Sequence, residues 1–222
     1  MIKRFFISML IVAIVSMYVV FDDILMTPIT HPRFTKITAQ GQPLSPWQGP
    51  WACVLDHQHN LLWEVKTDDE SIHDGYWTYS WYDQGLGKAN FGDCYFESAR
   101  CDTQDLIRHT NDKTLCGQKN WRLPTERELA SLIQPPARPG QPYIAYDYFT
   151  HIKKGDYWTN HANVKLQQQF AHLKQGAKAV NFHNGKVVTL PYRNAAFVIL
   201  VSDITKAYSH AQLSSRDTST TH

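Results

Sequence analysis

Cysteine and histidine are the side chains in this sequence that could bind zinc, and cysteines could also form disulfide cross-links. The chain of 222 residues holds four cysteines: Cys53, Cys94, Cys101 and Cys116. His57 and His59 lie near the first of them, but no Cys-x-x-Cys pair occurs and the spacings fit no common zinc module. The even number of cysteines therefore favours two disulfides, and we expect no bound metal.

The pairing of the cysteines is not fixed by the sequence, because four cysteines allow three pairings. We favour Cys94–Cys101, which closes a short local loop. Its companion is then Cys53–Cys116, which ties an early strand to the centre of the chain. The other two pairings stay open at this point.

The sequence carries no common catalytic motif. It has no Gly-x-Ser-x-Gly elbow, no His-Glu-x-x-His helix and no phosphate-binding loop, and its eleven histidines are scattered. The acidic run Asp68, Asp69 and Glu70 could in principle take a hard cation, but it is more typical of a solvated loop. We therefore expect a protein that is not an enzyme and has no cofactor.

Positive charge is concentrated in the last third of the chain. Residues 1–150 hold 13 Lys and Arg against 17 Asp and Glu, whereas residues 151–222 hold 9 against 3, which sums to the net charge of +2. Such a basic region could meet acidic glycans, lipid headgroups or DNA. We favour an acidic polysaccharide, or another envelope protein, and expect no nucleic-acid partner. By itself, however, such a charge distribution is more typical of a solvated surface without a ligand.

The candidate ligand-binding residues combine positive charge with flat aromatic surfaces that could face a sugar: Lys174, Lys178, Lys186, Arg193, Tyr157 and Trp158. Lysine and arginine donate charge-assisted hydrogen bonds to sulfate or carboxylate groups. An alternative function is a structural or assembly subunit of a pilus-like surface complex. In that case the aromatic loops between residues 143 and 158 would form a protein interface.

The N-terminus is typical of a membrane-targeting segment. Lys3 and Arg4 precede an uncharged run from Phe5 to Phe21. This run of about 17 residues would span about 25 Å as a helix. It lacks an Ala-x-Ala cleavage pattern, which favours an uncleaved anchor at residues 1–23 over a signal peptide. We expect a single-pass protein of a bacterial inner membrane with its domain in the periplasm, or a secreted or surface protein if the segment is cleaved.

The remaining elements divide the chain into a stalk, a domain and a tail. Five prolines between residues 24 and 50 favour an extended stalk. The domain spans residues 51–203, and the polar residues 204–222 are expected to be disordered. Within the domain, the sequence predicts two helices and several short strands: strands at 51–56, 61–65, 168–173, 178–182, 186–190 and 196–202, and helices starting after Asp102 and Thr125. The pair Asn184-Gly185 predicts a hairpin.

The segment Asn120-Trp-Arg-Leu-Pro-Thr125, together with Cys53-Val-Leu-Asp56, Leu61-Leu-Trp-Glu64 and Tyr157-Trp-Thr159, resembles the Lcl C-terminal domain family. The resemblance implies an α+β, C-type-lectin-like fold, with two helices packed on small, mostly antiparallel sheets and held by disulfides. It also implies a non-catalytic binding or adhesion module, since the name-giving member is an adhesin associated with sulfated glycosaminoglycans. The related formylglycine-generating oxidases use late cysteines, and none follows Cys116 here.

Overall fold

The computed structural model describes residues 31, 33–94 and 101–204, and every element below lies in the unit that begins at Arg33. Short helices and antiparallel sheets joined by two disulfides make up this unit, which confirms the α+β class. Within the described ranges, no helix is both long and apolar enough to cross a bilayer. The expected anchor at residues 1–23 and nearly all of the expected disordered tail lie outside the described residues.

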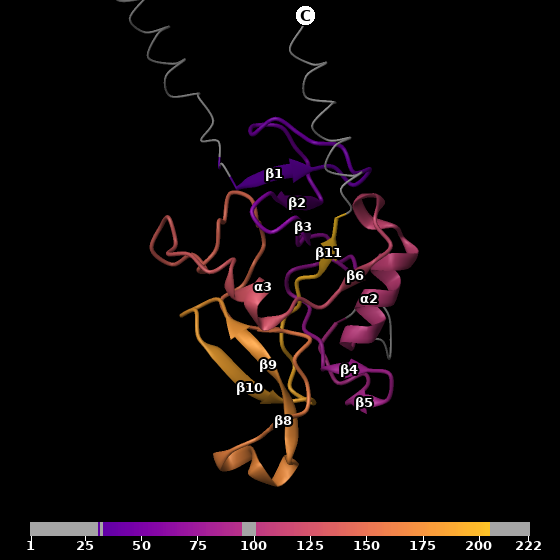
Figure 1. The fold of residues 1–222 in the computed structure, drawn as a ribbon, viewed down its shortest axis with the longest axis vertical. Helices are drawn as coiled ribbons and strands as arrows, with labels where there is room; N and C mark the ends of the chain where they lie inside the picture. The colour runs from indigo at the N-terminus through magenta and orange to yellow at the C-terminus, as the bar shows by residue number, and fades with distance from the viewer. Residues whose placement is uncertain (1–30, 32, 95–100, 205–222) are drawn as a thin grey trace, which may run out of the picture. The chain divides into compact units, whose positions relative to one another are not determined.

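The larger sheet has five strands in the order β1-β2-β3-β11-β6, and each neighbouring pair is antiparallel (Figure 1). Its strands are β1 (Phe34–Ile37), β2 (Cys53–Asp56), β3 (Leu61–Glu64), β11 (Val201–Asp203) and β6 (Trp121–Arg122). The strands expected at 51–56 and 61–65 are thereby confirmed. Asn60 takes the left-handed conformation between them, with φ of 54°.

Strand β1 corrects the boundary of the expected stalk, which was placed at residues 24–50. Arg33 binds Asp56 of β2 through two guanidinium nitrogens and donates a 2.8 Å hydrogen bond to the backbone oxygen of Ser131. Burial raises the pKa of Asp56, but Arg33 and His59 outweigh it and lower that pKa overall. Prolines favour extended chain, and extended chain can form a linker or pair as an edge strand.

The second sheet has the order β10-β9-β7, with β8 pairing beside β9 (Figure 1). Its strands are β7 (Asp156–Trp158), β8 (Val164–Lys165), β9 (Gln175–Asn181) and β10 (Val187–Pro191). The hairpin predicted from Asn184-Gly185 is confirmed, because β9 and β10 pair antiparallel around it. A small third sheet joins β4 (Tyr82–Asp83) and β5 (Leu86–Gly87).

The prediction of a strand at residues 168–173 is wrong, because Gln168–Leu173 forms the 3-10 helix η2. Positive φ angles at Gln168 (51°) and Lys174 (64°) interrupt extended chain at both ends of this segment. The strand predicted at 196–202 is also shorter than expected, since β11 begins only at Val201.

The two α-helices begin where the sequence predicted. Helix α2 (Thr103–Asp112) is capped by Asp102, whose carboxylate accepts a 3.0 Å hydrogen bond from the Asp105 N–H. Helix α3 (Glu126–Ala130) begins with a capping box between Thr125 and Glu128. A short 3-10 turn, η1 (Leu115–Gly117), lies between them and carries Cys116.

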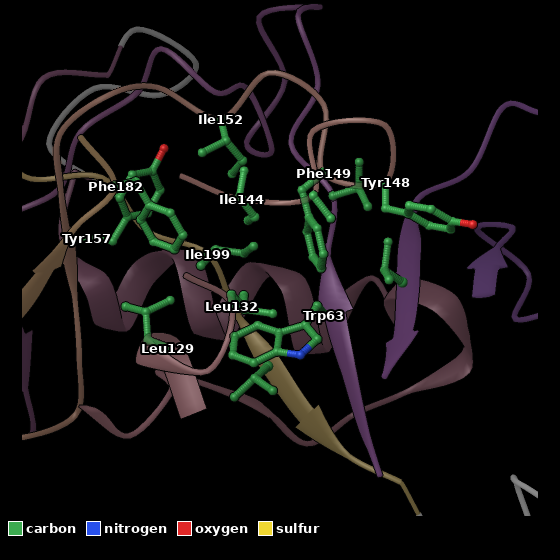
Figure 2. Close-up of a cluster of buried hydrophobic side chains, with 14 of the residues drawn as sticks. Trp63, Leu129, Leu132, Ile144, Tyr148, Phe149, Ile152, Tyr157, Phe182 and Ile199 are labelled. Carbon is green, nitrogen blue, oxygen red and sulfur yellow. The ribbon is translucent and has the colours of Figure 1, made fainter. Parts of the chain in front are cut away.

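Two disulfides and two hydrophobic clusters hold the unit together. Cys53–Cys116 joins β2 to η1, and Cys94–Cys101 closes a local loop, so the favoured pairing is confirmed. In one cluster, Trp63, Phe149 and Ile199 pack with residues of α3 and β9 (Figure 2). The other surrounds the buried rings of Trp121 and Trp158. The clusters lie on opposite faces of β9, because Val180 belongs to the first and Ala177 and Ala179 belong to the second.

The capping box of α3 gives a first prediction. Thr125 accepts from the Glu128 N–H at 3.2 Å, and Glu128 accepts from the Thr125 N–H at 2.7 Å. Thr125→Ala is expected to lower the free energy of unfolding by about 1 kcal/mol, measured by urea titration. Thr114→Ala is the matched control, because Thr114 precedes η1 without a side-chain capping bond. An equal loss in both variants would show that the capping bonds do not stabilise α3.

Candidate functional site

The segment from Tyr157 to Ser202 contains no aspartate or glutamate. It holds four lysines, one arginine and three histidines, and it supplies most of β7 and all of β8, η2, β9 and β10. The strands of the second sheet therefore carry positive side chains but only one carboxylate, that of Asp156 at the start of β7. Such a surface favours anions.

A hollow of about 410 Å³ lies against this sheet, on the side of β8 and η2. Its wall is one continuous stretch of chain from β8 into η2, and its floor comes from β9 and β10. The lining residues are Val164, Lys165, Leu166, Gln167, Gln168, Gln169, Phe170, Lys178 and Thr189. Figure 1 shows η2 as the orange coiled ribbon next to β8.

Strand register explains why these side chains meet. Lys178 of β9 is paired with Thr189 of β10, so both side chains lie on one face of the sheet. Val164 of β8 pairs with Gly176 on the other side of β9, two residues from Lys178. Farther along the same face, α3 and the first hydrophobic cluster cover β9, which leaves only this end open.

Gly176 lets the strands that form the floor of the hollow come together. A Cβ at this position would lie 2.0 Å from the backbone oxygen of Leu190 on β10, which is too close for two non-bonded atoms. Any larger residue would push β10 away from β9 and displace Thr189 relative to Lys178. The glycine is therefore required for the shape of the hollow.

The lining groups are suited to binding rather than to bond-making. Two lysine ammonium groups can donate charge-assisted hydrogen bonds to sulfate, carboxylate or phosphate. Three glutamine amides can donate to and accept from hydroxyl groups, and Phe170 adds a partly exposed ring. No carboxylate, histidine or cysteine is among the residues that line the hollow as the structure describes it.

The four basic candidates named from the sequence occupy different places. Lys178 lines the hollow. Lys174 is exposed just before β9, and its backbone oxygen accepts a 2.9 Å hydrogen bond from Leu166 N, so it lies at the rim. Lys186 is in the hairpin turn before β10, and Arg193 follows the other end of β10. The structure therefore brings together the first two and separates the last two.

The two aromatic candidates, Tyr157 and Trp158, are buried, which corrects the expectation that they face a ligand. The Tyr157 ring packs 4.8 Å from Phe182, centroid to centroid (Figure 2), and its hydroxyl accepts a 2.8 Å hydrogen bond from Lys153 N. Trp158 Nε1 donates to the backbone oxygen of Tyr79 at 2.7 Å. Strand β7 lies between the two hydrophobic clusters, so neither ring reaches the surface.

Burial also affects the loops between residues 143 and 158, which were considered above as a protein interface. Ile144, Tyr148, Phe149 and Ile152 are buried in the first cluster (Figure 2). Their apolar side chains fill the core, so they are not available to a partner.

A family model for the Lcl C-terminal domain matches residues 52–202. The chain belongs to the Lcl C-terminal domain family. No curated protein and no solved structure matches it. The matched residues include β2, β3, α2, α3 and the sheet that carries the hollow, so the Lcl C-terminal domain contains the whole candidate site.

The segment Asn120 to Thr125, which carries the family resemblance, joins three parts of the Lcl C-terminal domain. Asn120 donates to the backbone oxygen of Asp203 at 2.9 Å, and Trp121 is buried. Arg122 forms ion pairs with Glu128 of α3 and Asp203 of β11, both at 2.8 Å. These contacts give the segment a role in the scaffold, away from the hollow.

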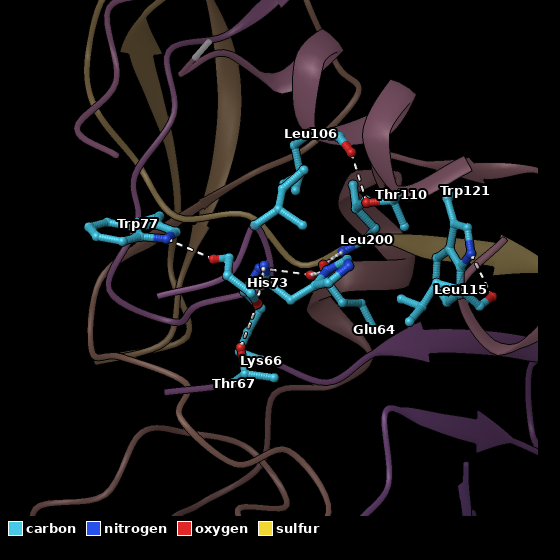
Figure 3. Close-up of polar contacts among 12 residues, drawn as sticks. Glu64, Lys66, Thr67, His73, Trp77, Leu106, Thr110, Leu115, Trp121 and Leu200 are labelled. Atoms are coloured by element: carbon cyan, nitrogen blue, oxygen red, sulfur yellow. Dashed lines mark hydrogen bonds and ion pairs between the residues drawn. The ribbon is translucent and has the colours of Figure 1, made fainter. Parts of the chain in front are cut away.

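A buried charge cluster lies around Glu64 (Figure 3). One carboxylate oxygen of Glu64 lies 2.8 Å from Lys66 Nζ and 2.8 Å from His73 Nδ1, and the other accepts from Leu200 N at 2.9 Å. Burial raises the pKa of Glu64, but Lys66 and His73 outweigh burial and lower it to about 2. The bond to Leu200 joins β3 to the chain before β11, and the charged groups of Glu64 and Lys66 are buried inside the domain.

Several lining residues were not singled out from the sequence. Lys165 was one of many lysines, and Gln167, Phe170 and Thr189 fell in or near predicted strands. Two features of the sequence could have indicated these residues. One is the absence of acidic residues between Tyr157 and Ser202, and the other is the run of three consecutive glutamines after β8.

Proposed function

We propose that this chain is a non-catalytic, envelope-anchored binding module with a C-type-lectin-like domain that holds an acidic glycan, as in adhesion. The ligand lies in the hollow beside β8, η2, β9 and β10. Residues 1–23 anchor the protein in a bacterial inner membrane, with the domain in the periplasm. The proposal needs neither a metal nor a cofactor.

The observation that carries this proposal is the composition of the hollow. Lys165 and Lys178 are the charged residues of its lining, and both are positive. Glutamine amides and the Thr189 hydroxyl surround them, which suits a ligand with hydroxyl groups between its acidic groups. An acidic polysaccharide has this combination, because each sugar carries several hydroxyls and some carry sulfate or carboxylate.

Binding of a heparin-like polymer is expected to depend on these two lysines. The double variant Lys165→Ala, Lys178→Ala should lose affinity by about tenfold or more, measured by titration calorimetry on the full chain. Binding should also weaken as salt is raised, since charges at a surface are screened over about 8–10 Å at ordinary ionic strength. Omitting calcium should leave the affinity unchanged.

The matched control removes the same charge elsewhere. Lys113→Ala, Lys119→Ala changes two exposed lysines near the end of α2 and should bind the polymer like the wild type. Lys186→Ala, Arg193→Ala removes basic residues at the two ends of β10, outside the hollow, and should have a smaller effect than Lys165→Ala, Lys178→Ala. Equal losses in all three double variants would mean that net charge, and not the hollow, holds the polymer.

A further inference from the structure

The turn that carries Trp47 is the most exposed apolar feature among the described residues. Trp47 is 70% exposed as a residue, against 63% for Tyr76, 54% for Phe91 and 38% for Val187. Tyr76 and Phe91 each have a lysine nitrogen over the ring, at 3.3 Å and 4.7 Å from the centroid. No described cation or ring covers Trp47.

This exposure is built into the backbone of the turn. Gln48 N donates to the backbone oxygen of Ser45 at 2.9 Å, which closes a four-residue turn with Pro46 second and Trp47 third. The Gln48 side chain accepts a second 2.9 Å hydrogen bond from Ser45 N. The turn is thus held at both ends, and the Trp47 residue that it carries is mostly exposed.

The loop around the turn is tied to the domain at its base. Leu44 N donates to the Lys36 backbone oxygen at 2.9 Å, and Ala52 N donates to the Ile37 backbone oxygen at 2.9 Å. Trp51 Nε1 donates to the backbone oxygen of Tyr148 at 2.8 Å. A ring presented by so well-fixed a loop is positioned to contact something outside the domain.

The loop carries no charge. From Ile37 to Leu55 the sequence contains no aspartate, glutamate, lysine or arginine. Charged groups would have to be removed from water on entering a lipid interface, whereas tryptophan is enriched there because its ring is apolar and its N–H is polar. The composition therefore fits a lipid headgroup region better than the acidic ligand proposed above.

The length of chain before the domain places a bilayer within reach. The apolar run ends at Phe21, and the described unit begins at Arg33. The roughly 11 residues between them extend to at most about 40 Å. The chain then enters β1, and the Trp47 loop follows directly, folding back along that strand. The loop therefore lies beside the strand with which the chain from the proposed anchor enters the domain.

We infer that the Trp47 turn is a membrane-contact site that inserts its indole ring into the headgroup region of the bilayer that holds the proposed anchor. Within the described unit, β1 and β8 lie at opposite ends (Figure 1). Contact through the Trp47 turn would therefore direct the hollow away from the lipid, toward its ligand. The inference rests on the proposed anchor but is independent of the glycan.

Tryptophan fluorescence in vesicles provides the test. All seven tryptophans lie at position 47 or later, so the anchor contributes none. The full chain is reconstituted into phosphatidylcholine–phosphatidylglycerol vesicles with ordinary or brominated acyl chains, since bromine quenches a nearby indole. Brominated vesicles should quench the wild type, and Trp47→Phe should remove roughly two thirds or more of that quenching, since the other indoles are buried or half-buried.

Trp77→Phe is the control, because Trp77 is half-buried and donates to the Ser71 backbone oxygen. It should leave the quenching by brominated lipid intact. Flotation of the vesicles reports the anchor separately, and heparin binding reports the hollow separately. The inference is overturned if both the wild type and Trp47→Phe float with the vesicles and brominated lipid quenches them equally. It is also overturned if the wild type does not float.

Contact of Trp47 with a partner other than lipid would give different results, and each of these results would also overturn the inference. A second copy of this chain on Trp47 would make its emission depend on the ratio of protein to lipid. A glycan on Trp47 would shift that emission when a heparin-like polymer is added. Trp47→Phe should not change the midpoint of urea unfolding, because the ring is exposed, so loss of folding does not explain a loss of quenching.

Discussion

The double variant Cys53→Ala, Cys116→Ala is expected to unfold with a free energy about 4 kcal/mol lower than that of the wild type. The disulfide that it removes joins residues 63 positions apart, so its loss frees a long loop in the unfolded chain. It also removes the link between β2 and η1, beside the buried ring of Trp121. Urea unfolding, followed by the near-ultraviolet circular dichroism of the buried tryptophans, measures the loss.

The second disulfide is the internal control for this result. Cys94 and Cys101 are only 7 positions apart, so Cys94→Ala, Cys101→Ala is expected to cost about 2 kcal/mol on the same entropic argument. The long cross-link should therefore matter more than the short one. A larger loss from removing Cys94 and Cys101 would contradict the account based on loop length.

The buried charge cluster gives the second large effect. Glu64→Gln keeps an oxygen for Leu200 N but removes the negative charge between Lys66 and His73 (Figure 3). The Lys66 ammonium would then be buried without a counter-charge, which is expected to cost about 3 kcal/mol or more in the free energy of unfolding. Equilibrium urea titration at neutral pH measures this cost.

A double variant separates the cost of an unpaired charge from the loss of packing. Glu64→Gln, Lys66→Met removes both charges of the pair and keeps similar volumes, so it should be more stable than Glu64→Gln alone. If the two substitutions simply add, the electrostatic explanation of the cluster is wrong.

The same cluster predicts how stability depends on pH. The pKa of Glu64 is about 2 in the folded protein, compared with a reference of 4.5. Because the folded value is lower, ionised Glu64 stabilises the fold fully above about pH 4.5, and this stability is lost as pH falls toward 2. The lost contribution is about 3 kcal/mol. The difference in unfolding free energy between wild type and Glu64→Gln should therefore shrink between pH 4.5 and 2.

Much of the local structure followed from short-range patterns in the sequence. Asp102 and Thr125 marked the starts of α2 and α3, because a capping side chain bonds to backbone only three residues away. Asn184-Gly185 marked the β9–β10 hairpin, because the turn needs residues that tolerate a positive φ, as Gly185 has at 73°. The short Cys94–Cys101 loop also suggested the correct disulfide pairing.

The candidate site was only partly predictable. Lys178 was named from its position in a basic stretch, and it lines the hollow. Tyr157 and Trp158 were named because aromatic rings bind sugars, but both are buried. An aromatic residue in a short strand has the same local pattern whether its ring faces solvent or a core, since the pattern alone does not show what covers each face of the strand.

By itself, the sequence determined the family, the α+β class, the helix starts, the hairpin and the uneven distribution of charge. Only the tertiary structure decided that β1 completes the larger sheet, that η2 replaces a predicted strand, and that Lys165 lies with Lys178 and Thr189 around one hollow. The physical reason is the range of the contacts involved. Caps and turns are formed by residues a few positions apart, whereas burial and the shape of a site depend on which distant segments pack together.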